Sequence, residues 1–165
     1  MSIADARWYA CHTRPRCEKK FAALLAASGF EHYLPLITSV RRYPRETKRF
    51  TKPLFAGYVF ARVPDVAKAR IYEQELIARA IAVDDEARFL RQIEDVRKIV
   101  ASGAELSVVP LLTLGRRVRV VGGPLHGLEG LVDDATNPAG IVISVDVLRQ
   151  GLLIKVPAES LEALP

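Results

Sequence analysis

Residues 54–63, LFAGYVFARV, form the most strand-like run in the first half of the chain. Aromatic and β-branched side chains, which favour pleated strands, fill many of its positions. A second run, rich in aromatics, lies near the N-terminus at residues 7–12, RWYACH, and also suits a strand. Residues 30–40 look extended again, although Pro35 favours a sheet edge or a break there. These runs predict a sheet in the first part of the chain.

Apolar residues recur at helical spacing between and after these strands. The expected helices span residues 18–28, 64–77 and 85–102, and a short strand is expected at 81–83. Gly29 and Gly103 supply the left-handed stops of the first and third helices. The order of strands and helices predicts an α+β fold, in which an N-terminal antiparallel sheet is backed by helices in a sandwich.

Residues 41–52, RRYPRETKRFTK, carry six cations and one anion, with two aromatics between them. No face of this segment could be buried, because unpaired charges are costly to remove from water. The segment is therefore expected to form a solvated loop or hairpin.

The hydrophobic period changes to two in the last third of the chain. The candidate strands lie at 117–120, 130–132, 141–148 and 152–156, with turn signals between them. Several short strands with no helix between them predict a small β-barrel. The expected domains are 1–103 and 115–165, joined by a linker at 104–114.

The two parts differ in charge, which suggests different partners. Residues 1–103 carry a net charge of +7, and residues 104–165 carry −2. The basic part is the candidate for nucleic acid, because cations gain free energy by releasing counterions from phosphates. No apolar stretch approaches the ~18 residues that span a bilayer, and the N-terminus lacks the regions of a signal peptide. A cytoplasmic protein with no membrane partner is expected.

Two segments together resemble the NusG family of transcription factors. Trp8-Tyr9 opens the first strand, and Pro53-Leu54-Phe55-Ala56-Gly57-Tyr58-Val59-Phe60 follows, in a pattern similar to the family's N-terminal (NGN) domain. Residues 117–130, RVRVVGGPLHGLEG, resemble the KOW motif that opens the family's C-terminal SH3-like barrel. The resemblance covers nearly the whole chain. It implies a monomeric transcription elongation factor that has no catalytic activity and needs no cofactor.

The resemblance also implies a site for RNA polymerase, whose clamp helices on the largest subunit would lie in a hydrophobic depression of the NGN domain. Phe55, Gly57 and Tyr58 fall on the matching motif, with Tyr9 and Leu54 as expected neighbours. Aromatic side chains would supply much of the affinity for such a helix. The alternative is that all five are core residues. Some must be, because a strand with aromatics on both faces can expose only one set.

Two groups of cations predict a second contact, with non-template or upstream DNA. They are Arg14, Arg16, Lys19 and Lys20 at the start of the first helix, and Arg41, Arg42, Arg45, Lys48, Arg49 and Lys52 on the charged segment. The aromatics interleaved with the second group favour this reading over that of a solvated charge run. Lys68 and Arg70 match, by position alone, the family's contact with the polymerase gate loop.

Leu125, Leu128 and Leu148 are the candidate partner-binding residues of the barrel. The first two are apolar on a turn that should be polar, so they either face a partner or cap the open end of the barrel. The resemblance implies a small-subunit ribosomal protein or Rho as the partner. The housekeeping member of the family has phenylalanines at these positions. This departure resembles a specialised paralogue of the RfaH type, which suppresses pausing and acts in antitermination.

Two other readings carry less support. A metal site would draw on Cys11, His12 and Cys17, but neither a C-x-x-C spacing nor a second ligand pair is present. A ribosome-associated or RNA-binding KOW protein is the rival from another class. It predicts cations on the barrel, whereas the barrel half of the chain is net negative.

Overall fold

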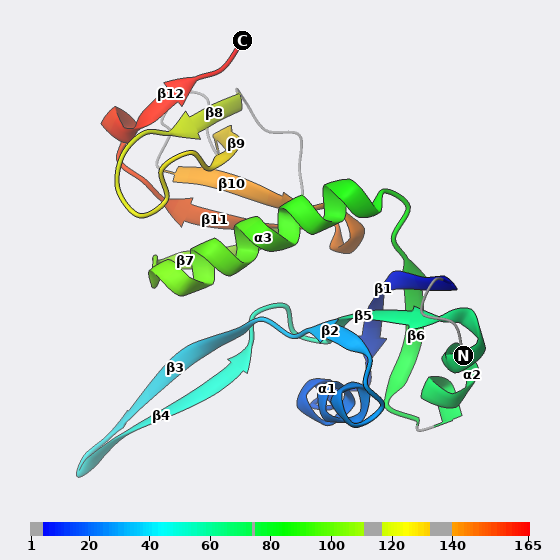
Figure 1. Cartoon of the computed structure of the whole chain (residues 1–165). Helices are drawn as coiled ribbons and strands as arrows, with labels where there is room; N and C mark the ends of the chain where they lie inside the picture. The colour runs from blue at the N-terminus through cyan, green and yellow to red at the C-terminus, as the bar shows by residue number, and fades with distance from the viewer. Residues whose placement is uncertain (1–4, 74, 111–116, 133–139) are drawn as a thin grey trace. The chain divides into compact units, whose positions relative to one another are not determined.

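The computed structural model describes residues 5–73, 75–110, 117–132 and 140–165 (Figure 1). The chain divides into two compact units, Met1–Glu86 and Ala87–Pro165. The first unit combines a sheet, two helices and a projecting hairpin. The second combines one long helix with a sheet of short strands.

A four-stranded antiparallel sheet forms the centre of the first unit. Its strands stand in the order β2-β5-β1-β6, and span Glu31–Tyr33 (β2), Tyr58–Pro64 (β5), Ala6–Thr13 (β1) and Ile77–Ala82 (β6). In the central pair, Ala10 lies opposite Phe60 and His12 lies opposite Tyr58. The two runs that the sequence identified as the most strand-like are therefore neighbours in the sheet.

Helices α1 (Glu18–Ala27) and α2 (Asp65–Glu73) contribute to the core on one face of this sheet. Alternate residues of β1 and β5 point to this face, and the core joins them to apolar residues of the helices. Its buried members are Tyr9, Cys11, Phe21, Leu25, Val59, Ala61, Val63, Ile71 and Ile77. The predicted antiparallel sheet backed by helices is confirmed.

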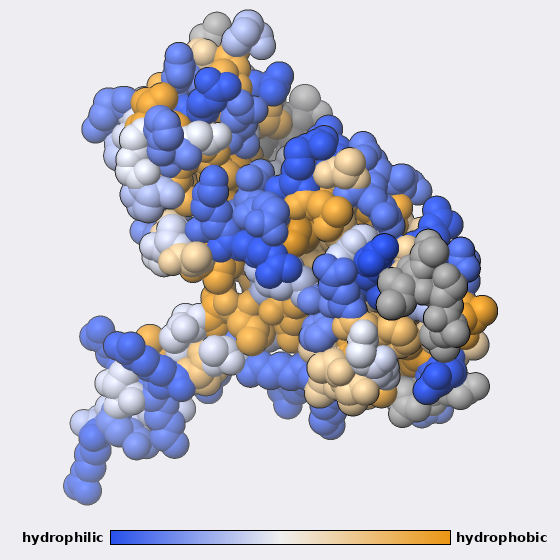
Figure 2. Space-filling view, in the orientation of Figure 1, coloured by the Kyte–Doolittle hydropathy of each residue, from blue (hydrophilic) through white to orange (hydrophobic). Residues whose placement is uncertain are grey.

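The charged segment lies within a long two-stranded hairpin that projects from the sheet (Figure 1). Strands β3 (Leu36–Tyr43) and β4 (Glu46–Pro53) pair along their whole length around a two-residue loop. Figure 2 shows the projecting part as hydrophilic. Of the loop or hairpin that the sequence allowed, the hairpin forms, and its strands extend well beyond residues 41–52.

The end of α2 and the start of β6 differ from the sequence expectation. The helix was expected to reach residue 77, but it ends at Glu73, and β6 begins at Ile77 instead of at residue 81. The backbone N–H of Ala80 donates to the Tyr72 hydroxyl at 2.8 Å, which ties the strand to the last turn of the helix. Pairing of β6 with the free edge of β1 therefore prevails over helical spacing in this segment.

The second unit contains a six-stranded antiparallel sheet, in the order β12-β8-β9-β10-β11-β7. Its strands span Leu161–Ala163 (β12), Arg117–Val120 (β8), Glu129–Val132 (β9), Gly140–Val145 (β10), Gln150–Lys155 (β11) and Leu106–Pro110 (β7). Short 3-10 turns, Asp146–Leu148 and Ala158–Ser160, precede the last two strands of the chain. The predicted small all-strand region is confirmed, and Val132, Ile141, Ile143 and Ile154 lie in its buried interior.

Gly130 on β9 shows how closely these strands pack. A β-carbon at this position would lie 2.4 Å from the carbonyl oxygen of Val142 on β10. Real β-carbons do not approach a backbone atom so closely. Close packing of β9 on β10 therefore requires glycine at position 130, the last residue of the KOW-like motif.

The long helix α3 (Glu86–Ser102) lies in the second unit with this sheet. Arg88 Nε lies 2.6 Å from the Asp146 carboxylate, and the backbone N–H of Asp146 donates to Gln92 at 3.2 Å. Part of the expected linker at 104–114 is strand β7, which pairs with β11, and residues 111–116 lie outside the described residues. The domain boundaries drawn from the sequence stay a prediction.

Candidate functional site

One face of the four-stranded sheet is rich in aromatic rings. The register places five rings on it, which we call the aromatic sheet face: Trp8, His12, Tyr33, Tyr58 and Phe60. Trp8 and Phe60 are buried, whereas His12, Tyr33 and Tyr58 are half-buried. This is the face opposite to the one packed against α1 and α2.

Tyr58 is the predicted polymerase-binding residue that lies on this face with an accessible ring. It stacks on His12, with the ring centroids 4.9 Å apart and the planes 16° from parallel. His12 lies directly opposite Tyr58 in the register, so the pairing of β1 with β5 fixes the stack. The sequence analysis considered His12 only as a metal ligand. The sequence could have indicated that His12 shares a face with Trp8, because the two are four residues apart on one strand and alternate side chains point to the same side.

Tyr9, which was predicted to bind the polymerase together with Tyr58, points to the opposite face of the sheet. It is buried in the helix-covered core, and its hydroxyl donates to Asp65 Oδ1 at 2.6 Å. The hydrogen bond to Asp65, together with burial, raises the pKa of Tyr9 to about 12. Lys68 Nζ lies 4.8 Å from the centre of the Tyr9 ring, while Arg70 is exposed on the same helix. Tyr9 and Lys68 therefore join β1 to α2.

Leu54 and Phe55 are buried, with 6% and 1% of their surfaces exposed. Phe55 packs edge to face on Phe60, with the ring centroids 6.4 Å apart. Its position supports the aromatic sheet face from within. A direct contact between Phe55 and a partner stays a prediction, and it would require the surrounding side chains to move.

Gly57 shapes the turn that presents Tyr58. Its φ of +86° is in the left-handed region, and a β-carbon there would lie 3.4 Å from the His12 ring. Its N–H donates to Glu18 Oε2 at 3.1 Å, and its carbonyl accepts from the N–H of Thr13 at 2.8 Å. Glu18, a buried carboxylate at the start of α1, is a positioning residue that the sequence analysis missed.

The residues of the metal alternative do not form a cluster. Cys11 and His12 are successive residues of β1, so their side chains point to opposite faces of the sheet. Burial raises the pKa of the Cys11 thiol to about 12. Among the described residues, no group of three or more His, Cys, Asp or Glu side chains could hold a metal ion.

The two predicted groups of DNA-binding cations meet at the root of the hairpin. Lys19 Nζ, on α1, donates to the carbonyl oxygen of Thr51 at 2.8 Å and to its hydroxyl at 3.1 Å. Arg14, Arg16 and Lys20 are exposed around the start of α1, and the six cations of the hairpin are exposed as well. Lys19 thus holds the hairpin to the helix.

The three predicted partner-binding leucines are buried in the second unit. Leu125 and Leu148 each expose 7% of their surface, and Leu128 exposes 2%. Leu148 lies in the 3-10 turn that begins with Asp146, the residue bound by α3. The partner-binding role of these leucines stays a prediction, and in this structure they pack in the interior.

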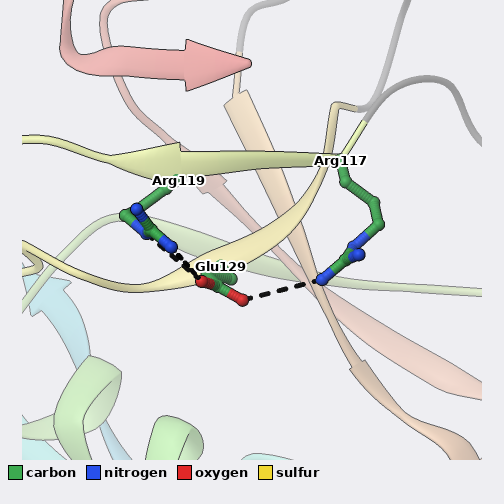
Figure 3. Close-up of polar contacts among 3 residues, drawn as sticks. All are labelled: Arg117, Arg119 and Glu129. Carbon is green, nitrogen blue, oxygen red and sulfur yellow. Dashed lines mark hydrogen bonds and ion pairs between the residues drawn. The ribbon is translucent and has the colours of Figure 1, made fainter. Parts of the chain in front are cut away.

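Polar and apolar side chains together line a hollow between α3 and the sheet. Glu129 binds Arg119 at 2.7 Å and Arg117 at 3.7 Å (Figure 3). Arg117 and Glu129 line this hollow of about 720 Å³, together with Asp95 of α3. Burial raises the pKa of Asp95, and the charge of Glu129 adds to the effect.

Comparison with known proteins agrees with this architecture. A family model described as "Transcription termination factor nusG" matches residues 6–113. A structure of Thermotoga maritima NusG, reported for its domain interaction, has a TM-score of 0.52 at 16% identity, and the match covers 99% of this chain and 100% of that one. A chain of the MjSpt4:Spt5 complex has a TM-score of 0.33 at 15% identity, with coverages of 95% and 96%. No curated protein sequence matches significantly.

The protein has two compact units, and it combines an antiparallel sheet that has an aromatic face with a basic hairpin and a small all-strand region. Because the family model matches more than half of the chain, the protein belongs to the NusG family. It is therefore a transcription elongation factor, in a family of non-enzymatic proteins. None of the described helices is both long and apolar enough to cross a membrane.

Proposed function

We propose that this protein binds the clamp helices of RNA polymerase through the aromatic sheet face and suppresses pausing. The observation that carries the proposal is the stack of Tyr58 on His12, within the segment that the NusG family model matches. Half-buried aromatics offer a partner helix a large apolar contact at a small loss of side-chain entropy. Binding energy alone would shift the polymerase towards its pause-resistant conformation.

The cations around α1 and on the hairpin would contact the non-template strand or the upstream DNA. They are exposed, and Lys19 connects the two groups. Contacts of this kind are weak by themselves and depend on salt. Lys68 and Arg70 on α2 are the candidates for the gate-loop contact.

A protein partner is the proposed ligand of the C-terminal sheet, with a small-subunit ribosomal protein or Rho as the candidates. The alternative, RNA binding, requires cations that are available for phosphates. Arg117 and Arg119 are engaged by Glu129, and Lys155 lies 3.3 Å from Glu105. Exposed pairs of this kind are weak, but residues 104–165 carry a net charge of −2, and that charge favours the protein partner. Leu125, Leu128 and Leu148 would contribute only after a local rearrangement. These leucines stand where the housekeeping member of the family has phenylalanines, and that difference suggests a specialised, RfaH-like paralogue.

The test is binding of the full chain to a reconstituted elongation complex. Tyr58→Ala should weaken binding about tenfold or more, as expected for an aromatic hot spot, whereas Tyr58→Phe should keep it. Phe55→Ala is a poor probe, because truncating a buried phenylalanine costs about 3–5 kcal/mol of stability. Equal binding by wild type and a folded Tyr58→Ala variant would remove the aromatic sheet face from the proposal. If the wild type does not bind the elongation complex, the proposal that RNA polymerase is the partner is wrong.

A further inference from the structure

We propose that the β3–β4 hairpin binds single-stranded DNA through one of its two faces, on which Tyr43 and Phe50 stack against unpaired bases. This inference rests on the nucleic-acid contact of the proposed function and names its ligand and its contact residues. A transcribing polymerase keeps a stretch of DNA unpaired, so such a ligand is present wherever the factor acts.

The register of the hairpin sorts its side chains onto two faces. The first, which we call the ring face, carries Ile37, Ser39, Arg41, Tyr43, Glu46, Lys48, Phe50 and Lys52. The second, the threonine face, carries Thr38, Val40, Arg42, Thr47, Arg49 and Thr51 between the ends of the hairpin. Cations occur on both faces. Both aromatic rings of the hairpin occur on the first.

Each ring is exposed and is paired with a cation. Tyr43 and Phe50 expose 46% and 39% of their surfaces. Arg41 Cζ lies 5.4 Å from the centre of the Phe50 ring, and Lys48 Nζ lies 5.9 Å from the centre of the Tyr43 ring. Aromatic rings among cations are the combination by which proteins hold single strands, because every base has a π-face and every nucleotide a phosphate.

The spacing of the rings suits a strand that runs along the hairpin. Phe50 lies opposite Ser39, and Tyr43 is four residues further along β3. At ~3.4 Å per residue the rings are about 14 Å apart, or about four steps of a stacked strand and fewer of an extended one. Arg41 and Lys48 form the cross-strand pair between these positions, where the intervening phosphates would lie.

The attachment of the hairpin leaves the Tyr43 and Phe50 rings of the ring face exposed. Lys19 donates to the hydroxyl of Thr51, a residue of the threonine face. At the root of the hairpin Lys19 of α1 therefore contacts the threonine face, whereas Tyr43 and Phe50 lie on the ring face. The opposite face also provides a matched control, because it has exposed uncharged side chains of its own.

The test measures the affinity of the full chain for a fluorescent oligothymidine, for a duplex and for an RNA of equal length. Tyr43→Ala/Phe50→Ala should lower affinity for the single-stranded DNA by about thirtyfold or more, since each of the two stacked bases contributes about 1–3 kcal/mol. Its affinity for the duplex should change less than twofold. Thr38→Ala/Val40→Ala, which leaves the charge unchanged on the threonine face, should behave as wild type with all three probes.

Circular dichroism must show that each variant folds, and Tyr43→Leu/Phe50→Leu, which keeps apolar bulk without a ring, should lose the same affinity. Unchanged single-strand binding by a folded ring variant, an equal loss with the duplex, or tighter binding to RNA than to DNA would each overturn the inference. The elongation-complex assay separates the two proposals. A ring variant that still binds polymerase leaves the proposed function standing, whereas a wild type that fails to bind polymerase removes that function alone.

Discussion

The hydroxyl of Tyr9 lies 2.6 Å from the carboxylate of Asp65, so the first strand of the sheet is joined to α2 by one short hydrogen bond. Tyr9→Phe removes this bond and keeps the ring. It should lower the free energy of unfolding by about 1.5–3 kcal/mol near pH 7, the usual net value for a hydrogen bond to a carboxylate. Chemical denaturation of the two proteins measures the difference.

The same pair predicts how that difference changes with pH. Folding raises the pKa of Tyr9 from 10.0 to about 12, so its contribution is fully present below pH 10 and is lost as the pH rises to about 12. A pKa raised from 10.0 to about 12 corresponds to about 3 kcal/mol, which is at least as much as the hydrogen bond contributes near neutrality. The stability advantage of the wild type over Tyr9→Phe should therefore disappear at the upper end of this range. A difference that stays constant from pH 8 to pH 12 would contradict the assignment.

The two cysteines should differ sharply in reactivity. Cys11 exposes 2% of its surface, and burial raises its pKa to about 12, whereas Cys17 is half-buried at the start of α1. A thiol reagent reacts with an accessible thiolate. Under native conditions one cysteine should react quickly, and mass spectrometry should locate the adduct at Cys17. In denaturant both should react. Rapid native labelling of Cys11 would mean that the core around β1 opens readily.

Gly130→Ala should destabilise the second unit much more than a substitution at another glycine of the same motif. The new methyl group would meet the carbonyl oxygen of Val142 at 2.4 Å and side-chain atoms of Ile141 and Ile143 within 3 Å. Overpacking of this kind costs about 1–3 kcal/mol or more. Gly122→Ala is the control, because its β-carbon would meet no atom within 4 Å and only its φ of +86° is unfavourable. Similar melting temperatures for the two variants would count against the close packing of β9 on β10.

The sequence predicts the strands and helices better than the surfaces they present. The apolar and aromatic run at residues 54–63 predicts a strand with apolar side chains on both faces. The structure forms that strand at Tyr58–Pro64. Residues 54–57, which were expected to belong to it, instead form the turn that precedes it. Alternation does not reveal register, however. Tyr9 and Tyr58 were grouped by their motifs, yet Tyr9 pairs with Ala61 and points to the helices, whereas Tyr58 pairs with His12 and points away.

Burial is the property that motif resemblance predicts least well. Leu125 and Leu128 lie on a glycine-rich turn that the sequence suggests is exposed, but the turn folds both side chains into the interior. The sequence likewise identifies the cations of residues 41–52 without their division between two faces. That division depends on the pairing of Arg41 with Lys48, which only the three-dimensional register supplies.

A comparison of Lys19 with Lys20 can distinguish a structural cation from one that binds DNA. It and Lys20 are adjacent on α1 and were both predicted to contact DNA, but Lys19 donates to Thr51 at the root of the hairpin. Because its ammonium group satisfies the carbonyl and the hydroxyl of one residue, Lys19→Ala should loosen the base of β4. Hydrogen exchange at amides of β3 and β4 should become faster in this variant.

Lys20→Ala removes the same charge from the neighbouring exposed position and should leave hairpin exchange unchanged. Each variant loses at most one cation that binds phosphate. If Lys19 also contacts DNA, the salt dependence of DNA binding should therefore fall by a similar amount in the two variants. If it does not, the salt dependence should fall only in Lys20→Ala. A faster-exchanging hairpin with an unaltered salt slope in Lys19→Ala identifies a purely structural lysine. Equal exchange in the two variants would mean that the hairpin is held in place by the pairing of its own strands and by its attachment to the sheet, without help from α1.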